Sequence, residues 1–226
     1  MDQVINALAH DGHIRIIVAE TTQLVKEAQR IHDTYPTASA ALGRLLSITA
    51  IMGSMLKNEH DQITTTIYGD GPLHKSMAVA KSNGDIKGYI SNPHVHLINE
   101  KTQKLDVAQA IGNGHLEVIK DMSLKHNFIS TTDLVSGEIG EDFAHYFTVS
   151  EQTPSALSVG VLVDTDNEIL SAGALLIQMM PDADEGDILA AEHVITHLKP
   201  ISQIFHEGQN PKEVALALFE DVEILE

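Results

Sequence analysis

The stretch TASAALGRLLSITAIMGSMLK, residues 37–57, decides which fold the chain can adopt. Small and apolar side chains cover nearly every face of the helix that it would form, and Arg44 is its only charge before Lys57. A helix that is apolar all round is either buried in a protein core or spans a membrane. Arg44, the Ser and Thr hydroxyls inside the stretch and the lack of a basic flank favour a buried helix.

Segments with the pattern of β-strands lie on both sides of this helix in the sequence. They are found at 13–20, within 63–91 (three strands), at 115–122 and in a hairpin within 156–180. Shorter helices are expected at 22–32, at 105–111 and at 141–151. The dipeptide Asn83-Gly84 predicts a turn with positive φ at both residues. Sheets on opposite faces of the apolar helix would bury it, so the sequence predicts an α+β fold around a central helix.

Acidic residues are concentrated near the end of the chain. Residues 181–226 contain 11 Asp and Glu and 2 Lys, a net charge of -9 that is half of the total of -18. The breaker-rich run PDADEG, residues 181–186, marks where the composition changes. The chain is therefore predicted to have two units, a body at 1–180 and an acidic helical linker at 181–226.

The linker has the pattern of three short helices. They are expected at 185–198, at 200–207 and after Asn210, which forms a capping box with Glu213. An isolated helix shorter than about 12–15 residues is marginal in water. These helices must therefore hold by packing on something else, and a modest change could release them.

Charge and composition exclude several classes of function. A net charge of -18 argues against binding to nucleic acids and to anionic membranes. The absence of cysteine excludes disulfides, thiolate metal sites and cysteine nucleophiles. The glycines at 69–71 and 112–114 complete no nucleotide-binding motif. The first residues lack the basic and apolar pattern of a signal peptide, so a cytoplasmic location is expected.

The polar run SEQTPS, residues 150–155, could hold a nucleophile beside its base. A serine nucleophile elbow needs G-x-S-x-G between a strand and a helix, whereas this run follows a predicted helix and precedes a predicted strand. It is interpreted as a structural joint. The pairs His94/His96 and His193/His197 lack a third ligand for a metal. We therefore expect no enzyme, no catalytic site, no metal and no cofactor in this chain.

Arg44 is the one charge inside the apolar helix and is assigned a structural role. A buried charge needs a partner of opposite sign. Glu138 and Glu151 are the two candidates, and the sequence leaves the choice between them open.

Five stretches together resemble one known family. They are ALGRLL with MGSMLK (41–57), IYGDGPLHKSMAVAKSNGDIKGYISNP (67–93), LVSGEIGEDFAHYFTVSEQTPSALSVGVLV (134–163), GALLIQMMP (173–181) and VALALFEDVEIL (214–225). Over essentially its whole length the chain resembles the redox-regulated heat-shock holdases, the thirty-three-kilodalton heat-shock proteins or 33 kDa chaperonins. The joint at 150–155 and the turn GDGP at 69–72 are the most specific marks.

The resemblance implies a fold, an activity and a form of regulation. The fold would be a three-layer β/α/β domain around a buried helix, followed by a short helical linker and a C-terminal module with four cysteines. The activity would be ATP-independent binding of unfolding client proteins under heat or oxidative stress, with a homodimer as the active form. Zinc would be bound by the cysteines of the full-length protein, beyond Glu226. This chain has no cysteine, so no residue in it can carry the redox switch.

Large apolar residues of the linker are the candidates for client binding. They are Ile188, Ile195, Leu198, Ile201, Ile204, Phe205, Leu216 and Phe219. Unfolding of the zinc module would remove packing from the linker helices and make these residues available. An alternative is that they only tether the linker to the body. Two other functions remain open, a non-catalytic interaction scaffold and a metal-dependent hydrolase.

Overall fold

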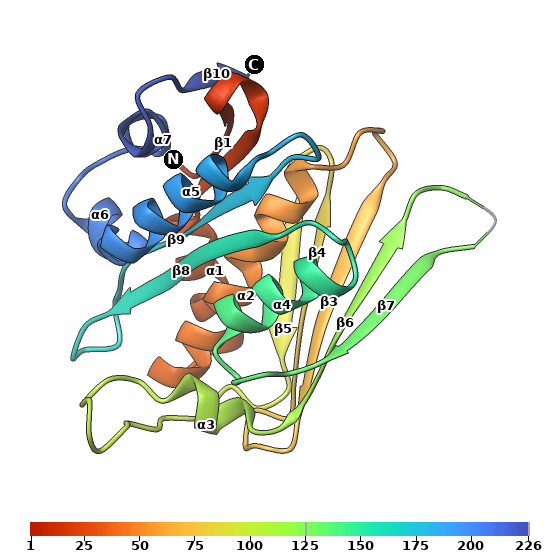
Figure 1. Ribbon diagram of the computed structural model, residues 1–226. Helices are drawn as coiled ribbons and strands as arrows, with labels where there is room; N and C mark the ends of the chain where they lie inside the picture. The colour runs from red at the N-terminus through yellow and green to blue at the C-terminus, as the bar shows by residue number, and fades with distance from the viewer. Residues whose placement is uncertain (125, 226) are drawn as a thin grey trace.

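Helix α2 (Pro36–Ser54) lies between two five-stranded sheets in the computed structural model, which describes residues 1–124 and 126–225 (Figure 1). All residues of α2 except Pro36, Arg44 and Ser54 are buried. The prediction of a central helix covered on both sides is confirmed, and with it the α+β class. None of the described helices is both long and apolar enough to cross a bilayer.

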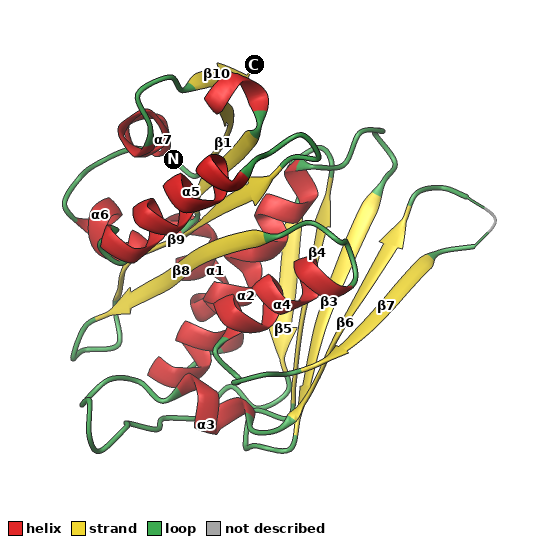
Figure 2. Ribbon diagram, viewed as in Figure 1, coloured by secondary structure: helices red, strands yellow, loops and turns green. Residues whose placement is uncertain are grey.

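Each sheet is antiparallel throughout its described strands. The first sheet has the order β10 (Glu223–Leu225), β1 (Gln3–Ala9), β2 (Ile14–Glu20), β9 (Ile169–Met179) and β8 (Ser155–Val163). The second has the order β5 (Ile86–Ile90), β4 (Lys75–Lys81), β3 (Gln62–Gly69), β6 (Gly114–Asp121) and β7 (Phe128–Asp133). Figure 2 shows the two sheets in yellow with the helix between them.

Short helices connect the sheets and follow the body. The body contains the 3-10 turn η1 (His10–Gly12), α1 (Thr22–His32), α3 (Val107–Ile111) and α4 (Ile139–Val149). The linker contains α5 (Glu185–His197), α6 (Ile201–His206), α7 (Pro211–Leu218) and then β10. Asn210 and Glu213 form the expected capping box at the start of α7. Because β10 pairs with β1, the linker ends as a strand of the first sheet.

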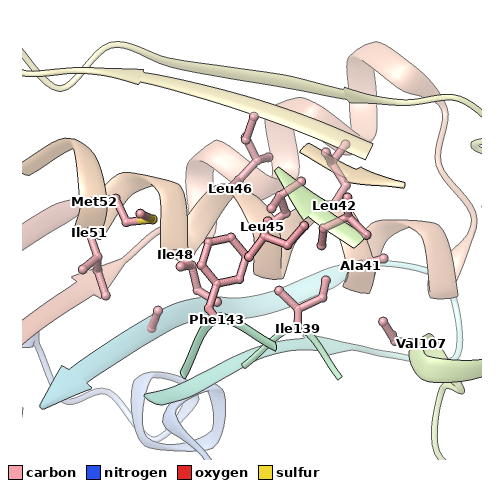
Figure 3. Packing of buried hydrophobic residues seen from close by; sticks show 14 of the residues in the cluster. Ala41, Leu42, Leu45, Leu46, Ile48, Ile51, Met52, Val107, Ile139 and Phe143 are labelled. Atoms are coloured by element: carbon pink, nitrogen blue, oxygen red, sulfur yellow. The ribbon is translucent and has the colours of Figure 1, made fainter. Parts of the chain in front are cut away.

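The main core lies between the sheets. Leu45 and Ile48 of α2 and Phe143 of α4 are all fully buried within it, and Figure 3 shows the Phe143 ring against the two α2 side chains. A second cluster lies on the outer face of the first sheet. Alternate residues of a strand point to opposite faces, so Ile17 of β2 joins the main core while Ile16 joins the outer cluster.

The turn between β4 and β5 differs from its prediction. Gly84 has a φ of 87°, but Asn83 does not share a positive φ. The Gly84 N–H donates to the Lys81 carbonyl at 3.1 Å, and the Lys81 N–H donates to the Asp85 carbonyl at 3.0 Å. Three residues therefore form the loop, with glycine at its last position, where a three-residue hairpin requires the left-handed conformation. A loop one residue longer removes the need for positive φ at Asn83.

Candidate functional site

The linker lies on the outer face of the first sheet, turned away from α2. Helices α5 and α6 contact β8 and β9, and α7 contacts β1 and β2. Figure 1 shows these helices, in blue, gathered on that side of the molecule. The apolar contact between linker and sheet is the outer cluster, and we call it the linker interface. All eight candidate residues for client binding belong to the linker helices or follow them.

Three of the candidate residues form the centre of the linker interface. Ile201 is fully buried, and Ile204 and Phe205 are each 7% exposed. They belong to the outer cluster, and α6 lies against β9 and β8. Burying a side chain of this size contributes about 1.5–3 kcal/mol relative to leaving it exposed. Helix α6 is therefore the main apolar anchor of the linker.

Helix α6 approaches the sheet closely because two strand positions are glycines. A Cβ atom at Gly173 would lie 2.2 Å from a ring carbon of Phe205, and one at Gly160 would lie 2.6 Å from the Ser202 hydroxyl oxygen. The Ser171 hydroxyl also donates to the Ser202 carbonyl at 2.6 Å. At the two glycines α6 therefore lies directly on the backbone of the sheet, and Ser171 of the sheet donates one buried hydrogen bond to it.

The other five candidate residues lie at the margin of the interface or outside it. Ile195, Leu198 and Phe219 are half-buried against the outer cluster. Ile188 and Leu216 are 41% and 46% exposed. These two side chains are already partly exposed to solvent while the linker is docked, so release of the linker would uncover less of them than of the buried residues of α6.

Several residues of the interface are absent from the predicted set. Val214 and Ala215 of α7 are buried in it, and Ala191 is the buried apolar residue of α5. Val214 and Ala215 could have been predicted from helical spacing, because residues three and four positions after Pro211 lie on the same face of the helix as Pro211. Choosing residues by size selected Leu216 instead.

A polar contact joins the start of α5 to the body. Asp187 is 6% exposed and accepts hydrogen bonds from Nδ1 of His10 at 2.8 Å and of His13 at 2.9 Å. The His10 ring also packs edge-on against Phe219, with 5.2 Å between ring centroids. The N–H of Asp184 and the two imidazoles hold the pKa of the Asp187 carboxyl below its usual value. This contact was not predicted, because 177 residues separate His10 from Asp187.

Arg44 and the joint at 150–155 form two separate ionic contacts. Arg44 donates to Glu138 at 2.5 Å. Glu151 accepts from Lys120 at 2.6 Å and from the Tyr146 hydroxyl. The joint itself connects α4 to β8, since the Thr153 N–H donates to the Phe147 carbonyl at 3.0 Å. Its polar groups are thus engaged in holding a helix end to a strand.

Tyr146 gives this joint a pH dependence. Burial first, and then the hydrogen bond to Glu151, raise the pKa of Tyr146 far above its usual value. The folded chain therefore holds the phenol proton more tightly than the unfolded chain does, and stability from this residue falls as the pH rises above about 10, by up to about 1.4 kcal/mol per pH unit. We expect urea unfolding to show a smaller loss of stability above about pH 10 in Tyr146→Phe than in the wild type. Equal losses of stability in the two proteins would contradict the conclusion that the Tyr146 phenol is buried and keeps its proton.

Among residues 1–124 and 126–225, no three His, Asp or Glu side chains are grouped as a metal site would require. Nδ1 of His197 contacts the His193 carbonyl oxygen at 2.8 Å, which leaves only its other ring nitrogen for a ligand. The described residues offer no thiolate of the kind that the resemblance implies for zinc. We therefore derive no step through a metal in this chain.

These elements define a class of protein. It is a three-layer α+β domain in which helices pack through apolar side chains on the outer face of one sheet. A family model described as "Hsp33 protein" matches residues 2–226. The chain belongs to the Hsp33 protein family, as its resemblance predicts. Membership supports a chaperone function, and proteins of this family are generally not enzymes.

Individual relatives agree with the family match. The chain is 46% identical over 228 residues to the 33 kDa chaperonin of Bacillus licheniformis, with 100% of this chain and 78% of that protein covered. It is 47% identical over 219 residues to the 33 kDa chaperonin of Oceanobacillus iheyensis, covering 96% and 75% of the two chains. The crystal structure of the Thermotoga maritima 33 kDa chaperonin superposes with a TM-score of 0.90 at 36% identity, covering 99% of this chain and 78% of that one.

Proposed function

We propose that the chain is an ATP-independent holdase that binds unfolding proteins through the surfaces of the linker interface. The observation that carries the proposal is an apolar cluster formed between the first sheet and short helices of the linker. Helices α6 and α7 have 6 and 8 residues. Helices of this length are not stable alone, so they depend on the cluster. Undocking would therefore release apolar residues from the linker and from the sheet at once.

The charge of the linker supports the same proposal. Its net charge of -9 resists collapse of the released segment and keeps a protein with exposed apolar residues in solution. The charge also disfavours nucleic acids and anionic membranes as partners. We infer a cytoplasmic chaperone that uses no nucleotide and acts as a homodimer.

Redox regulation is proposed for the full-length protein and not for these residues. Zinc bound by thiolates contributes about 10–16 kcal/mol of folding free energy to a small module, and oxidation of the thiolates removes that contribution. A module of this kind, packed on the linker, would keep the linker docked while it is reduced. The chain described here supplies the linker interface and none of the cysteines.

The first test is aggregation of a heat-unfolded client, followed by light scattering without ATP and under reducing conditions. We expect the wild-type chain to suppress scattering. A triple variant, Ile195→Ser, Leu198→Ser and Phe205→Ser, should suppress it at least about tenfold less per molecule if these residues contact clients, since each buried apolar side chain contributes about 1.5–3 kcal/mol. Ile31→Ser, on the exposed surface of α1, is the control and should behave as wild type.

The direction of the effect separates the two roles of the linker residues. Increased suppression by the triple variant would show that the residues only tether the linker and that the sheet beneath it binds clients. Unchanged suppression would contradict both roles. An interaction scaffold remains the second candidate, and it would bind one folded partner while leaving aggregation of unfolded proteins unchanged.

A further inference from the structure

A groove of about 610 Å³ is lined by residues of both sheets, of α1 and of α2. It is formed by the starts of β1 and α1, the C-terminal end of α2 and the hairpin between β4 and β5, and its lining residues all lie between 2 and 86. No linker residue contributes to it among the described residues. The groove is therefore present while the linker is docked.

The floor of the groove is apolar. Val4, Leu24, Ala50, Ala80 and Ile86 line it. The side chains of Val4, Leu24 and Ile86 are half-buried and pack on the main core, so they are held in place from below. A volume of this size lies within the range of about 300–1,000 Å³ that is typical of ligand pockets. It can accept one or two large apolar side chains.

The rim of the groove is acidic. Asp2, Glu20, Glu27 and Asp85 lie around it, and Lys81 is the basic residue in the lining. Glu27 is neutralised by Arg30 at 2.7 Å. Asp2 accepts from the N–H groups of Gln23 at 2.9 Å and Leu24 at 2.6 Å, which are uncharged donors. Three carboxylates thus face one ammonium group around an apolar floor.

Two of these carboxylates are available to a partner. In the described part of the chain Glu20 makes no side-chain hydrogen bond or ion pair, and the Asp85 carboxylate accepts one hydrogen bond, from the uncharged side-chain amide of Asn83 at 2.9 Å. An apolar floor with an unneutralised acidic rim complements a segment in which Lys or Arg flanks large apolar residues. Complementary charge across an interface raises the association rate and selects among partners.

We propose that this groove binds basic, apolar segments of unfolding proteins before the linker is released. The proposal rests on the holdase function and adds to it a preference among clients. The groove would hold a segment by its apolar side chains while Glu20 and Asp85 pair with its cations. Clients rich in acidic residues would depend on the linker interface alone.

The test measures binding of two labelled model peptides to the 226-residue chain by fluorescence anisotropy. Both contain leucine at alternate positions, and the other positions are lysine in one and glutamate in the other. We expect the lysine peptide to bind at least tenfold more tightly and its affinity to fall with added salt. The double variant Glu20→Gln and Asp85→Asn should lose about tenfold in affinity for the lysine peptide. Both residues lie at the surface rim, so the fold should be retained.

A charge-matched control distinguishes the groove from general attraction to an acidic protein. Glu100→Gln with Asp166→Asn removes two exposed carboxylates that do not line the groove and should leave the affinity unchanged. Equal losses in the two double variants would overturn the groove as the site. Ile86→Ser, in the floor, should weaken the lysine peptide without changing its salt dependence, and an unchanged affinity would likewise count against the groove.

The same variants separate this proposal from the holdase function. If Glu20→Gln with Asp85→Asn still suppresses aggregation of an acidic client but not of a basic one, both proposals are supported. If the variant binds the lysine peptide as wild type does, the groove is overturned, whatever the chain does in light scattering. If the wild type binds the lysine peptide but suppresses no aggregation, the holdase function fails while the groove stands. A dimer that the variant disrupts, with peptide affinity retained, would assign the groove to a second copy of the chain instead.

Discussion

Replacing Phe143 with alanine is expected to lower the free energy of unfolding by about 3–5 kcal/mol. Phe143 is fully buried and lies where α4 meets α2, with its ring against Leu45 and Ile48 (Figure 3). It also packs edge-on against Tyr146, with 6.3 Å between ring centroids. Truncation removes this contact area and leaves a cavity that the two surrounding layers cannot close. Urea unfolding followed by circular dichroism measures the change.

The matched control is Val149→Ala at the C-terminal end of the same helix. Val149 is 51% exposed, and its truncation should change the free energy of unfolding by less than about 0.5 kcal/mol. Helix propensity rises slightly with alanine at either position, so propensity cannot explain a difference between the two variants. Equal effects would mean that α4 does not pack on α2 through Phe143.

The central layer was predictable because composition alone decides the burial of α2. A helix that has no polar face must be covered on every side, and two sheets are the arrangement that the flanking strands allow. The sequence did not reveal β1, β7 or β10. β10 has three residues, and its pairing with β1 joins positions more than 200 residues apart, which no local pattern encodes. In β7, Phe128 and Ile129 are both exposed, so the alternation of buried and exposed residues is missing.

The linker interface was only partly predictable, for a similar reason. Large residues indicate that a helix packs, but the spacing along the helix decides which of them face the sheet. Ile188 and Leu216 are large and lie outside that face, whereas Ala191 and Ala215 are small and lie within it. The contact of Asp187 with His10 and His13 is a meeting of distant segments and has no signal in a single sequence.

The linker interface has a buried apolar centre with more exposed contacts around it. Its apolar centre is provided by α6, its outer helices are half-exposed, and its start is held by hydrogen bonds at Asp187. Because the helices are short, loss of the α6 contact removes the support of its neighbours as well. A single steric change under α6 should therefore act on the linker as a unit.

Gly160→Ala is expected to weaken docking of the linker by about 1–3 kcal/mol, a shift of about 5- to 150-fold in the docking equilibrium. The new methyl carbon would lie 2.6 Å from the Ser202 hydroxyl oxygen and 3.1 Å from its Cβ atom. Rotation of the hydroxyl relieves the first contact, and the second requires Ser202 to move away from β8 by a few tenths of an ångström. Limited proteolysis of the linker and hydrogen exchange in α6 should both accelerate, while urea unfolding of the body stays close to wild type. If the linker covers the client surface, suppression of aggregation should rise in parallel.

Ser202→Gly in the same chain is the control that assigns the effect to this contact. It removes both atoms that the alanine meets and keeps the carbonyl that accepts from Ser171. The double variant should recover most of the protease resistance that Gly160→Ala loses, because the coupling between two residues in contact appears as a departure from additivity. Equal sensitivity of the single and double variants would place the defect in β8 itself. Gly173→Ala would be a less selective probe, since its methyl carbon would meet the Ala19 carbonyl oxygen at 2.4 Å as well as the Phe205 ring, and would disturb the sheet together with the linker.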